Sequence, residues 1–125
     1  MQQTGTKLKD ADMHEMSIAL SIIDLATEQA KKANASKINE IELDIGTLSG
    51  VEIEALNFAM ELAVKDTMLE SSQVRINHIK ALSECQECSH QFDASSVINP
   101  CPKCNELNTR IVVGQELQVK SLIIE

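Results

Sequence analysis

All four cysteines of the 125-residue sequence lie in one short stretch, as two C-x-x-C pairs separated by twelve residues. The first pair is Cys85 and Cys88, and the second is Cys101 and Cys104. Two such pairs at this separation can bring four thiolates to the corners of a tetrahedron, which is the ligand arrangement of a closed structural zinc site. We therefore expect a zinc ribbon that holds the fold together and has no open metal position for catalysis.

Two other uses of the same cysteines stay open. A rubredoxin-like iron site has the same four-sulfur geometry, but such domains surround the metal with aromatic side chains, and this stretch contains only Phe92. Disulfides or a redox-active C-x-x-C are the second alternative, and they are disfavoured because neither pair precedes a helical pattern. Asn99 and Pro100 are typical of a turn, and Asn105 tolerates the left-handed backbone that a metal-binding turn needs.

The composition argues against nucleic-acid binding. Nineteen Asp and Glu side chains oppose eleven Lys and Arg, which gives a formal charge of −8, and the sequence contains two Phe but no Trp or Tyr. Binding to phosphates needs basic patches, and stacking on bases needs aromatic side chains. The apolar runs are too short for a membrane span, and four metal-spaced cysteines without a secretory signal are typical of a reducing setting. We expect a cytoplasmic protein that binds neither nucleic acid nor membrane.

The rest of the sequence predicts two helices and a small sheet. Apolar residues recur at helical spacing over residues 16–33 and again over 51–65. Alternation of apolar and polar residues, or a short apolar run, predicts strands at 41–45, 74–78, 111–113 and 117–124. This order predicts an α+β fold in which two helices pack on a small three-stranded sheet, with the four-cysteine zinc ribbon inserted between two of its strands.

The expected boundaries follow from this order. The zinc-binding domain should occupy residues 81–110, and the α/β domain should occupy residues 13–80 and 111–125. Residues 1–12 are polar and show no helical or strand period, so we expect an extension outside the fold, either disordered or left over from cloning. At the second helix, a capping box predicts Ser49 as the N-cap with Glu52 reaching back to it.

Four segments of the sequence together resemble the HypA/HybF family, whose members insert nickel during [NiFe]-hydrogenase maturation. They are M-H-E-M-S-I-A-L from Met13, I-G-T-L-S-G-V-E-I-E-A-L-N-F-A-M-E from Ile45, the two cysteine pairs, and G-Q-E-L-Q-V-K-S-L-I-I-E from Gly114. The resemblance covers residues 13–125 in order. It implies a nickel metallochaperone, not an enzyme, that delivers Ni(II) to the hydrogenase large subunit and works with the GTPase HypB.

The resemblance also assigns candidate metal ligands. Nickel would be bound at the Met-His-Glu tripeptide through His14, with Glu15 as a further candidate, and the family's zinc ligands correspond to the four cysteines. Taken alone, His14 would be interpreted as an ordinary solvated residue. Imidazole suits Ni(II), which accepts a square-planar set of nitrogen donors. Glu52 could add a carboxylate, although its capping role is the preferred interpretation.

Twelve residues precede Met13, where the family's tripeptide would open the chain. A terminal amine titrates at about 8 and can be a metal ligand, whereas an internal amide is far less acidic. We therefore expect translation or processing to begin at Met13, and the full-length form to bind nickel more weakly. The alternative function is a zinc-ribbon protein-interaction module with no nickel role. The sequence leaves open whether a hydrogenase or a urease is served, and whether the protein is a monomer or a homodimer that swaps its final strand.

Overall fold

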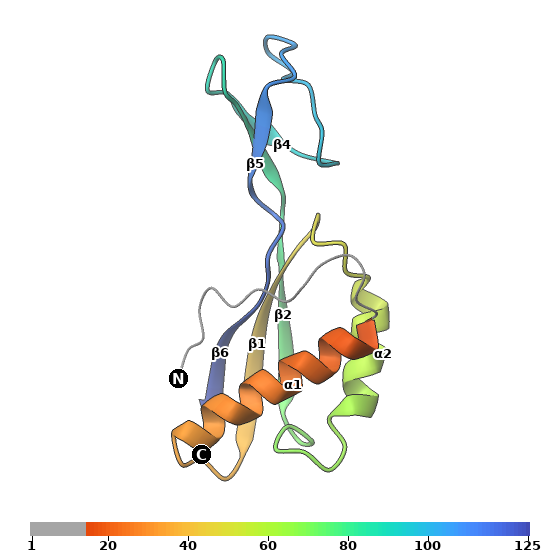
Figure 1. Cartoon of the computed structure of the whole chain (residues 1–125), viewed down its shortest axis with the longest axis vertical. Coiled ribbons are helices and arrows are strands. Elements are labelled where there is room, and N and C mark those ends of the chain that lie inside the picture. The colour runs from red at the N-terminus through yellow and green to blue at the C-terminus, as the bar shows by residue number, and fades with distance from the viewer. Residues whose placement is uncertain (1–14) are drawn as a thin grey trace.

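The computed structural model describes residues 15–125, in which an α/β body carries a slender second lobe (Figure 1). The elements, in chain order, are α1 (Glu15–Lys32), β1 (Ile38–Gly46), α2 (Ile53–Ala63), β2 (Gln73–Ile79), β3 (Leu82–Cys85), β4 (Gln91–Asp93), β5 (Thr109–Val113) and β6 (Leu117–Ile124). The body contains α1, α2 and a sheet with the strand order β2-β1-β6. The second lobe contains a sheet with the order β4-β3-β5 and the four cysteines, and we call it the cysteine lobe.

The predicted α+β architecture is confirmed for residues 15–125, with two helices on a three-stranded sheet and an inserted four-cysteine module. β1 is the central strand of the body, since it pairs in parallel with β2 and antiparallel with β6. Its alternate residues Ile41, Leu43 and Ile45 are fully buried and pack in one cluster with Ile22 of α1 and Leu56 of α2. Neither of these helices combines the length and apolarity needed to cross a bilayer.

The other face of this sheet is polar. Glu40, Glu42 and Asp44 alternate with the core residues of β1, so their side chains lie on the face opposite the apolar cluster. Asn77 Nδ2 donates to Glu42 Oε2 at 2.7 Å and to Asp44 Oδ1 at 2.9 Å. Arg75 Nη1 donates to Glu40 Oε1 at 2.8 Å. These partners from β2 allow three acidic residues to share one strand face.

The strand expected at residues 111–113 does not join the body. Ile111 pairs with Ser83 of β3, and Val113 pairs with Leu82, so β5 belongs to the sheet of the cysteine lobe. By strand pairing this lobe therefore continues to Val113, beyond the boundary expected at residue 110. A short apolar run gives no information about which sheet it joins, because its pattern is the same in both. The final strand, β6, pairs with β1 of its own chain.

The second helix also begins later than expected. Its N-cap is Glu52 and not Ser49, and the Glu52 carboxylate accepts a hydrogen bond from the Glu54 N–H at 3.4 Å. Ser49 Oγ instead accepts from the Val51 N–H at 3.2 Å, inside the loop before the helix. Glu52 thus caps α2, which agrees with the capping role predicted for it. Ser49 does not act as its reciprocal partner, so the two residues do not form a capping box.

Two chain crossings form the neck between the body and the cysteine lobe, residues 79–81 and 114–116 (Figure 1). The second crossing touches both the end of β1 and the first crossing at backbone distance. A Cβ atom added to Gly46 would lie 2.0 Å from the Gly114 carbonyl oxygen, and one added to Gly114 would lie 2.3 Å from the Ala81 Cα. Gly114 also has a φ of 117°, which L side chains rarely adopt. Glycine is therefore required twice at the neck.

The loop after β1 is tied to both crossings. The Thr47 N–H donates to the Ile79 carbonyl at 2.9 Å, and the Leu48 N–H donates to the Gly114 carbonyl at 2.7 Å. Thr47 Oγ1 also accepts from the Ala81 N–H at 3.1 Å. The same loop leads directly into α2, so the neck and the start of this helix are connected through a few hydrogen-bonded residues.

Candidate metal centre

The cysteine lobe ends in two turns of the same conformation, one for each C-x-x-C pair. In the first turn the Ser89 N–H donates to the Cys85 carbonyl at 2.9 Å, and in the second the Asn105 N–H donates to the Cys101 carbonyl at 2.8 Å. Ser89 and Asn105 both take left-handed backbone angles, with φ of 64° and 63°. The sequence predicted this conformation for Asn105. It did not predict it for Ser89, because serine is not a residue that usually adopts it.

Each turn directs backbone N–H groups at its first sulfur. The N–H groups of Glu87 and Cys88 both lie 3.4 Å from Cys85 Sγ. In the second turn, the Lys103 N–H lies 3.4 Å from Cys101 Sγ. Hydrogen bonds of this kind stabilise the thiolate, which is the form of cysteine that binds a metal.

The four sulfurs converge on one point. All four Sγ atoms lie within 4.8 Å of one another, with 3.6 Å between Cys85 and Cys104 and 3.7 Å between Cys88 and Cys101. Tetrahedral zinc with Zn–S distances of about 2.3 Å would separate its sulfurs by about 3.8 Å. A disulfide would need about 2.05 Å. The spacing therefore fits a four-thiolate metal site, and each sulfur of one turn faces a sulfur of the other.

The four thiols do not ionise equally. Burial opposes ionisation of Cys101, but hydrogen bonds from the N–H groups of Cys104 and Lys103 outweigh it and lower the pKa of this thiol to about 7. For Cys104, the Glu106 N–H favours the thiolate, yet burial and the three neighbouring thiols raise its pKa to about 12. Four thiolates at these distances repel one another, so all four can ionise together only with a cation between them.

His90 follows the first cysteine pair but makes contacts of its own. Its ring stacks on Phe92, with centroids 6.0 Å apart and 18° between the planes. Its backbone carbonyl accepts from the Cys85 N–H at 2.9 Å. The structure thus gives His90 a role in shaping the first turn.

Met13 and His14, the first two residues of the predicted nickel-binding tripeptide, lie outside the described residues. Glu15 is the first described residue and begins α1. Its Oε2 accepts a hydrogen bond from the Glu52 backbone N–H at 3.2 Å, which joins the N-terminal ends of α1 and α2. The two candidate carboxylate ligands, Glu15 and Glu52, therefore lie side by side on the body. Sequence patterns could not pair them, since 37 positions separate them.

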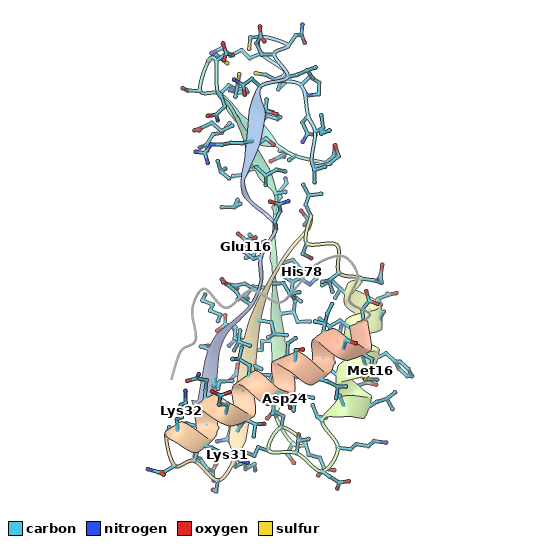
Figure 2. All side chains as sticks on the ribbon, in the orientation of Figure 1. Met16, Asp24, Lys31, Lys32, His78 and Glu116 are labelled. Atoms are coloured by element: carbon cyan, nitrogen blue, oxygen red, sulfur yellow. The ribbon has the colours of Figure 1, made fainter. Side chains whose placement is uncertain are left out.

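The third histidine, His78, is exposed near the neck end of β2 (Figure 2). It pairs in register with Ile45 of β1, on the strand face that also carries Val74 and Ile76. Within residues 15–125, the four cysteines are the one group of three or more His, Cys, Asp or Glu residues whose ligand atoms could share a metal ion. The described part of the chain therefore contains one candidate metal-ligand set.

Comparison with known proteins agrees with this arrangement. The family model described as "Hydrogenase/urease nickel incorporation, metallochaperone, hypA" matches residues 13–124. The hydrogenase maturation factor HypA of Parabacteroides distasonis is 42% identical over 113 residues, which cover 90% of this chain and 98% of the relative. The hydrogenase maturation factor HypA of Chlorobaculum parvum is also 42% identical over 113 residues, covering 90% and 100%.

Two solved structures share the fold. The solution structure of the Ni metallochaperone HypA from Helicobacter pylori has a TM-score of 0.65 and 32% identity, and the match covers 90% of this chain and 97% of that one. A second solution structure, of a HypA protein, has a TM-score of 0.69 and 31% identity, with 91% and 98% covered. The similarity thus spans the body and the cysteine lobe together.

Proposed function

Because the chain belongs to the HypA family of hydrogenase/urease nickel-incorporation metallochaperones, we propose that it binds Ni(II) as a transient cargo and delivers it to the large subunit of a [NiFe]-hydrogenase. Its relatives are named as maturation factors, and a protein of this class is not an enzyme. The observation that carries the proposal is the family match over residues 13–124, which begins with the Met-His-Glu tripeptide.

His14 is the proposed nickel ligand, and Glu15 is a second candidate. Imidazole is a suitable donor for Ni(II), and backbone amides next to it can close adjacent chelate rings. The Glu15 carboxylate accepts one hydrogen bond, from the Glu52 N–H, on an exposed part of the surface. Releasing such a bond costs about 1 kcal/mol, so Glu15 could turn toward a metal at little expense. A ligand set of this kind exchanges its metal readily, which a carrier requires.

We propose zinc as the resident metal of Cys85, Cys88, Cys101 and Cys104. The sulfur spacings of 3.6 and 3.7 Å support this choice, as does a donor set made only of thiols. Bound zinc would supply no redox chemistry, and with four protein ligands it would leave no position for water. Its role would be to join the two turns. Iron would fit the same tetrahedron, but it would colour the protein, so a colourless, zinc-containing preparation excludes it.

The partners in this proposal are the hydrogenase large subunit, as recipient, and the GTPase HypB. The sequence contains no Gly-rich phosphate-binding loop, so nucleotide hydrolysis during delivery must come from a partner. A cytoplasmic location fits the reduced state that four metal-binding thiols require.

The proposal is tested by replacing each of two histidines by alanine and counting both metals. His14→Ala should lose nickel binding in equilibrium dialysis and keep one zinc per chain by elemental analysis. His78→Ala is the matched control, because this exposed side chain lies on a strand of the body, and the variant should keep both metals. Undiminished nickel binding by His14→Ala would contradict the proposal and favour the alternative, a zinc-ribbon interaction module with no nickel role.

A further inference from the structure

A groove lies between α2 and β2, the edge strand of the body's sheet. It encloses about 420 Å³, and its walls come from both elements. Met60 contributes from α2, Val64 from the C-cap of that helix, and Val74 from β2. Met60 is buried and the two valines are half-buried, so the floor of the groove is apolar.

One wall of the groove is a free sheet edge. β2 pairs with β1 along residues 73–79, and it has no second strand neighbour among residues 15–125. Alternate backbone N–H and C=O groups therefore point outward without a strand partner. An edge strand that borders a helix-lined groove is the arrangement in which protein domains bind an extended peptide as an additional strand.

The rim of the groove is acidic. Glu61 of α2 and Glu70, in the turn before β2, both line it and are exposed. Neither residue takes part in the ion pairs formed within residues 15–125, and none of the described residues that line the groove is basic. An incoming segment would therefore meet negative charge above an apolar floor.

From the free edge, the apolar floor and the acidic rim together, we infer that this groove binds an extended segment of a partner protein with the pattern basic-x-apolar-x-basic. The segment adds to β2 as an outer strand, and its apolar side chain enters between α2 and β2. Residues two positions apart in a strand point to the same side, so the two basic side chains flank the apolar one and reach Glu61 and Glu70. This surface is separate from the proposed nickel ligands and goes beyond the cargo function.

The intervening positions of the segment also have a preference. They would point to the opposite face of the sheet, where Arg75 is the neighbouring basic side chain on β2. Basic residues at these positions would lie beside Arg75, which already pairs with Glu40, and would compete with it for that carboxylate. The spacing of the charges therefore matters as well as their number. A second copy of the chain is a poor occupant. Two chains that each carry a formal charge of −8 and the same acidic rim would repel one another.

The test uses two synthetic peptides of the same composition, both acetylated and amidated. The first, Thr-Lys-Thr-Val-Thr-Lys-Thr, has the inferred pattern, and the second, Thr-Thr-Lys-Val-Lys-Thr-Thr, places its basic residues next to the apolar one. Each is titrated into the isotopically labelled full-length protein while the amide NMR spectrum is recorded. The first peptide should bind at least tenfold more tightly, shift the amides of residues 73–79 and slow the hydrogen exchange of alternate ones.

The Glu61→Lys variant should weaken binding of the first peptide about tenfold. Asp24→Lys is the matched control, since Asp24 is an exposed acid on α1 (Figure 2) that does not line the groove, and the change alters the net charge by the same amount. Equal binding of both peptides, equal losses in both variants, or shifts centred on Glu42 would overturn the inference and indicate general attraction to an acidic protein. Concentration-dependent shifts of residues 73–79 without peptide would also overturn it, by assigning the edge to a second copy.

Discussion

The body and the cysteine lobe keep their shapes by different means. The body has one large aliphatic cluster built from both helices and all three strands of its sheet. Within residues 81–113, the buried residues are Ala81, Ser83, Cys85, Asn99 and Cys101. Two of these are candidate metal ligands, and the Ser83 hydroxyl has no hydrogen-bond partner among the described residues.

The other apolar residues of the cysteine lobe do not make up for its small number of buried residues. Val97, Ile98 and Leu107 are 62%, 73% and 67% exposed, so they contribute little burial. A module of this size without a core needs another source of stability, and a metal bound by four thiolates is the usual one. The comparison sets a region held by apolar contacts against a region whose small core, in our proposal, is supplemented by one metal ion.

Removing the metal should have the largest effect. Replacing Cys101 by serine, or adding a strong chelator, should unfold the cysteine lobe while the body stays folded, because structural zinc contributes about 10 kcal/mol or more to such modules. Amide NMR should show collapsed dispersion for residues 82–113 and native shifts for α1 and β1. Restoring zinc should reverse the chelator's effect. If the body unfolds together with the lobe, the two regions are not independently stabilised.

Truncating a core side chain of the body should destabilise the body and leave the cysteine lobe intact. Leu43→Ala removes a side chain that is 1% exposed on the central strand, and it should lower the free energy of unfolding of the body by about 3 kcal/mol. Urea denaturation followed by circular dichroism measures this loss, and the zinc content should remain one per chain. Leu107→Ala in the cysteine lobe is the control and should change stability very little. A comparable loss in this variant would show that the lobe has an apolar core after all.

The neck should respond to a single added methyl group. Gly114→Ala would place a Cβ 2.3 Å from the Ala81 Cα at a φ of 117°, so it should destabilise the protein by about 3 kcal/mol or alter the angle between the regions. Gly50→Ala is the matched control, because Gly50 has a φ of 85° but open space around its Cα, and it should cost about 1 kcal/mol. Thermal unfolding measures both. Equal costs would mean that the close approach at the neck is unimportant.

The smallest effect concerns the polar face of the body's sheet. Hydrogen bonds from Asn77 and then Ser121 lower the pKa of the Glu42 carboxyl below its ordinary value. A lowered pKa stabilises the folded protein above the unfolded value of about 4.3, and this contribution is lost as the pH falls through the folded pKa. Asn77→Ala should therefore be less stable than the wild type at pH 7, with a difference that shrinks in acid. A difference that is constant with pH would assign the loss to packing.

The two regions also differ in how far the sequence predicts them. The convergence of the four cysteines was predictable, because they lie in two local turns whose spacing alone brings the sulfurs together. The alternation of Ile41, Leu43 and Ile45 likewise predicted the central strand of the body. Both features depend on short-range patterns.

What could not be predicted depends on contacts between distant segments. Residues 111–113 pair with β3 because the chain returns alongside that strand, and their apolar character does not encode this choice. Ser49 has the local pattern of an N-cap, but it lies in a loop whose Thr47 and Leu48 are bound to the neck, so the helix begins at a later residue. The contact between Glu15 and Glu52 joins two helix ends that no local pattern relates.

The hydrogen bonds from Thr47 and Leu48 to the neck have a mechanical consequence. The cysteine lobe cannot tilt on the body without either losing these bonds or pulling residues 47–48 along with it. These residues stand a few positions before Glu52, which caps α2 and donates to Glu15 at the start of α1. A displacement of the cysteine lobe would therefore be passed through residues 47–52 to the first turns of α1 and α2.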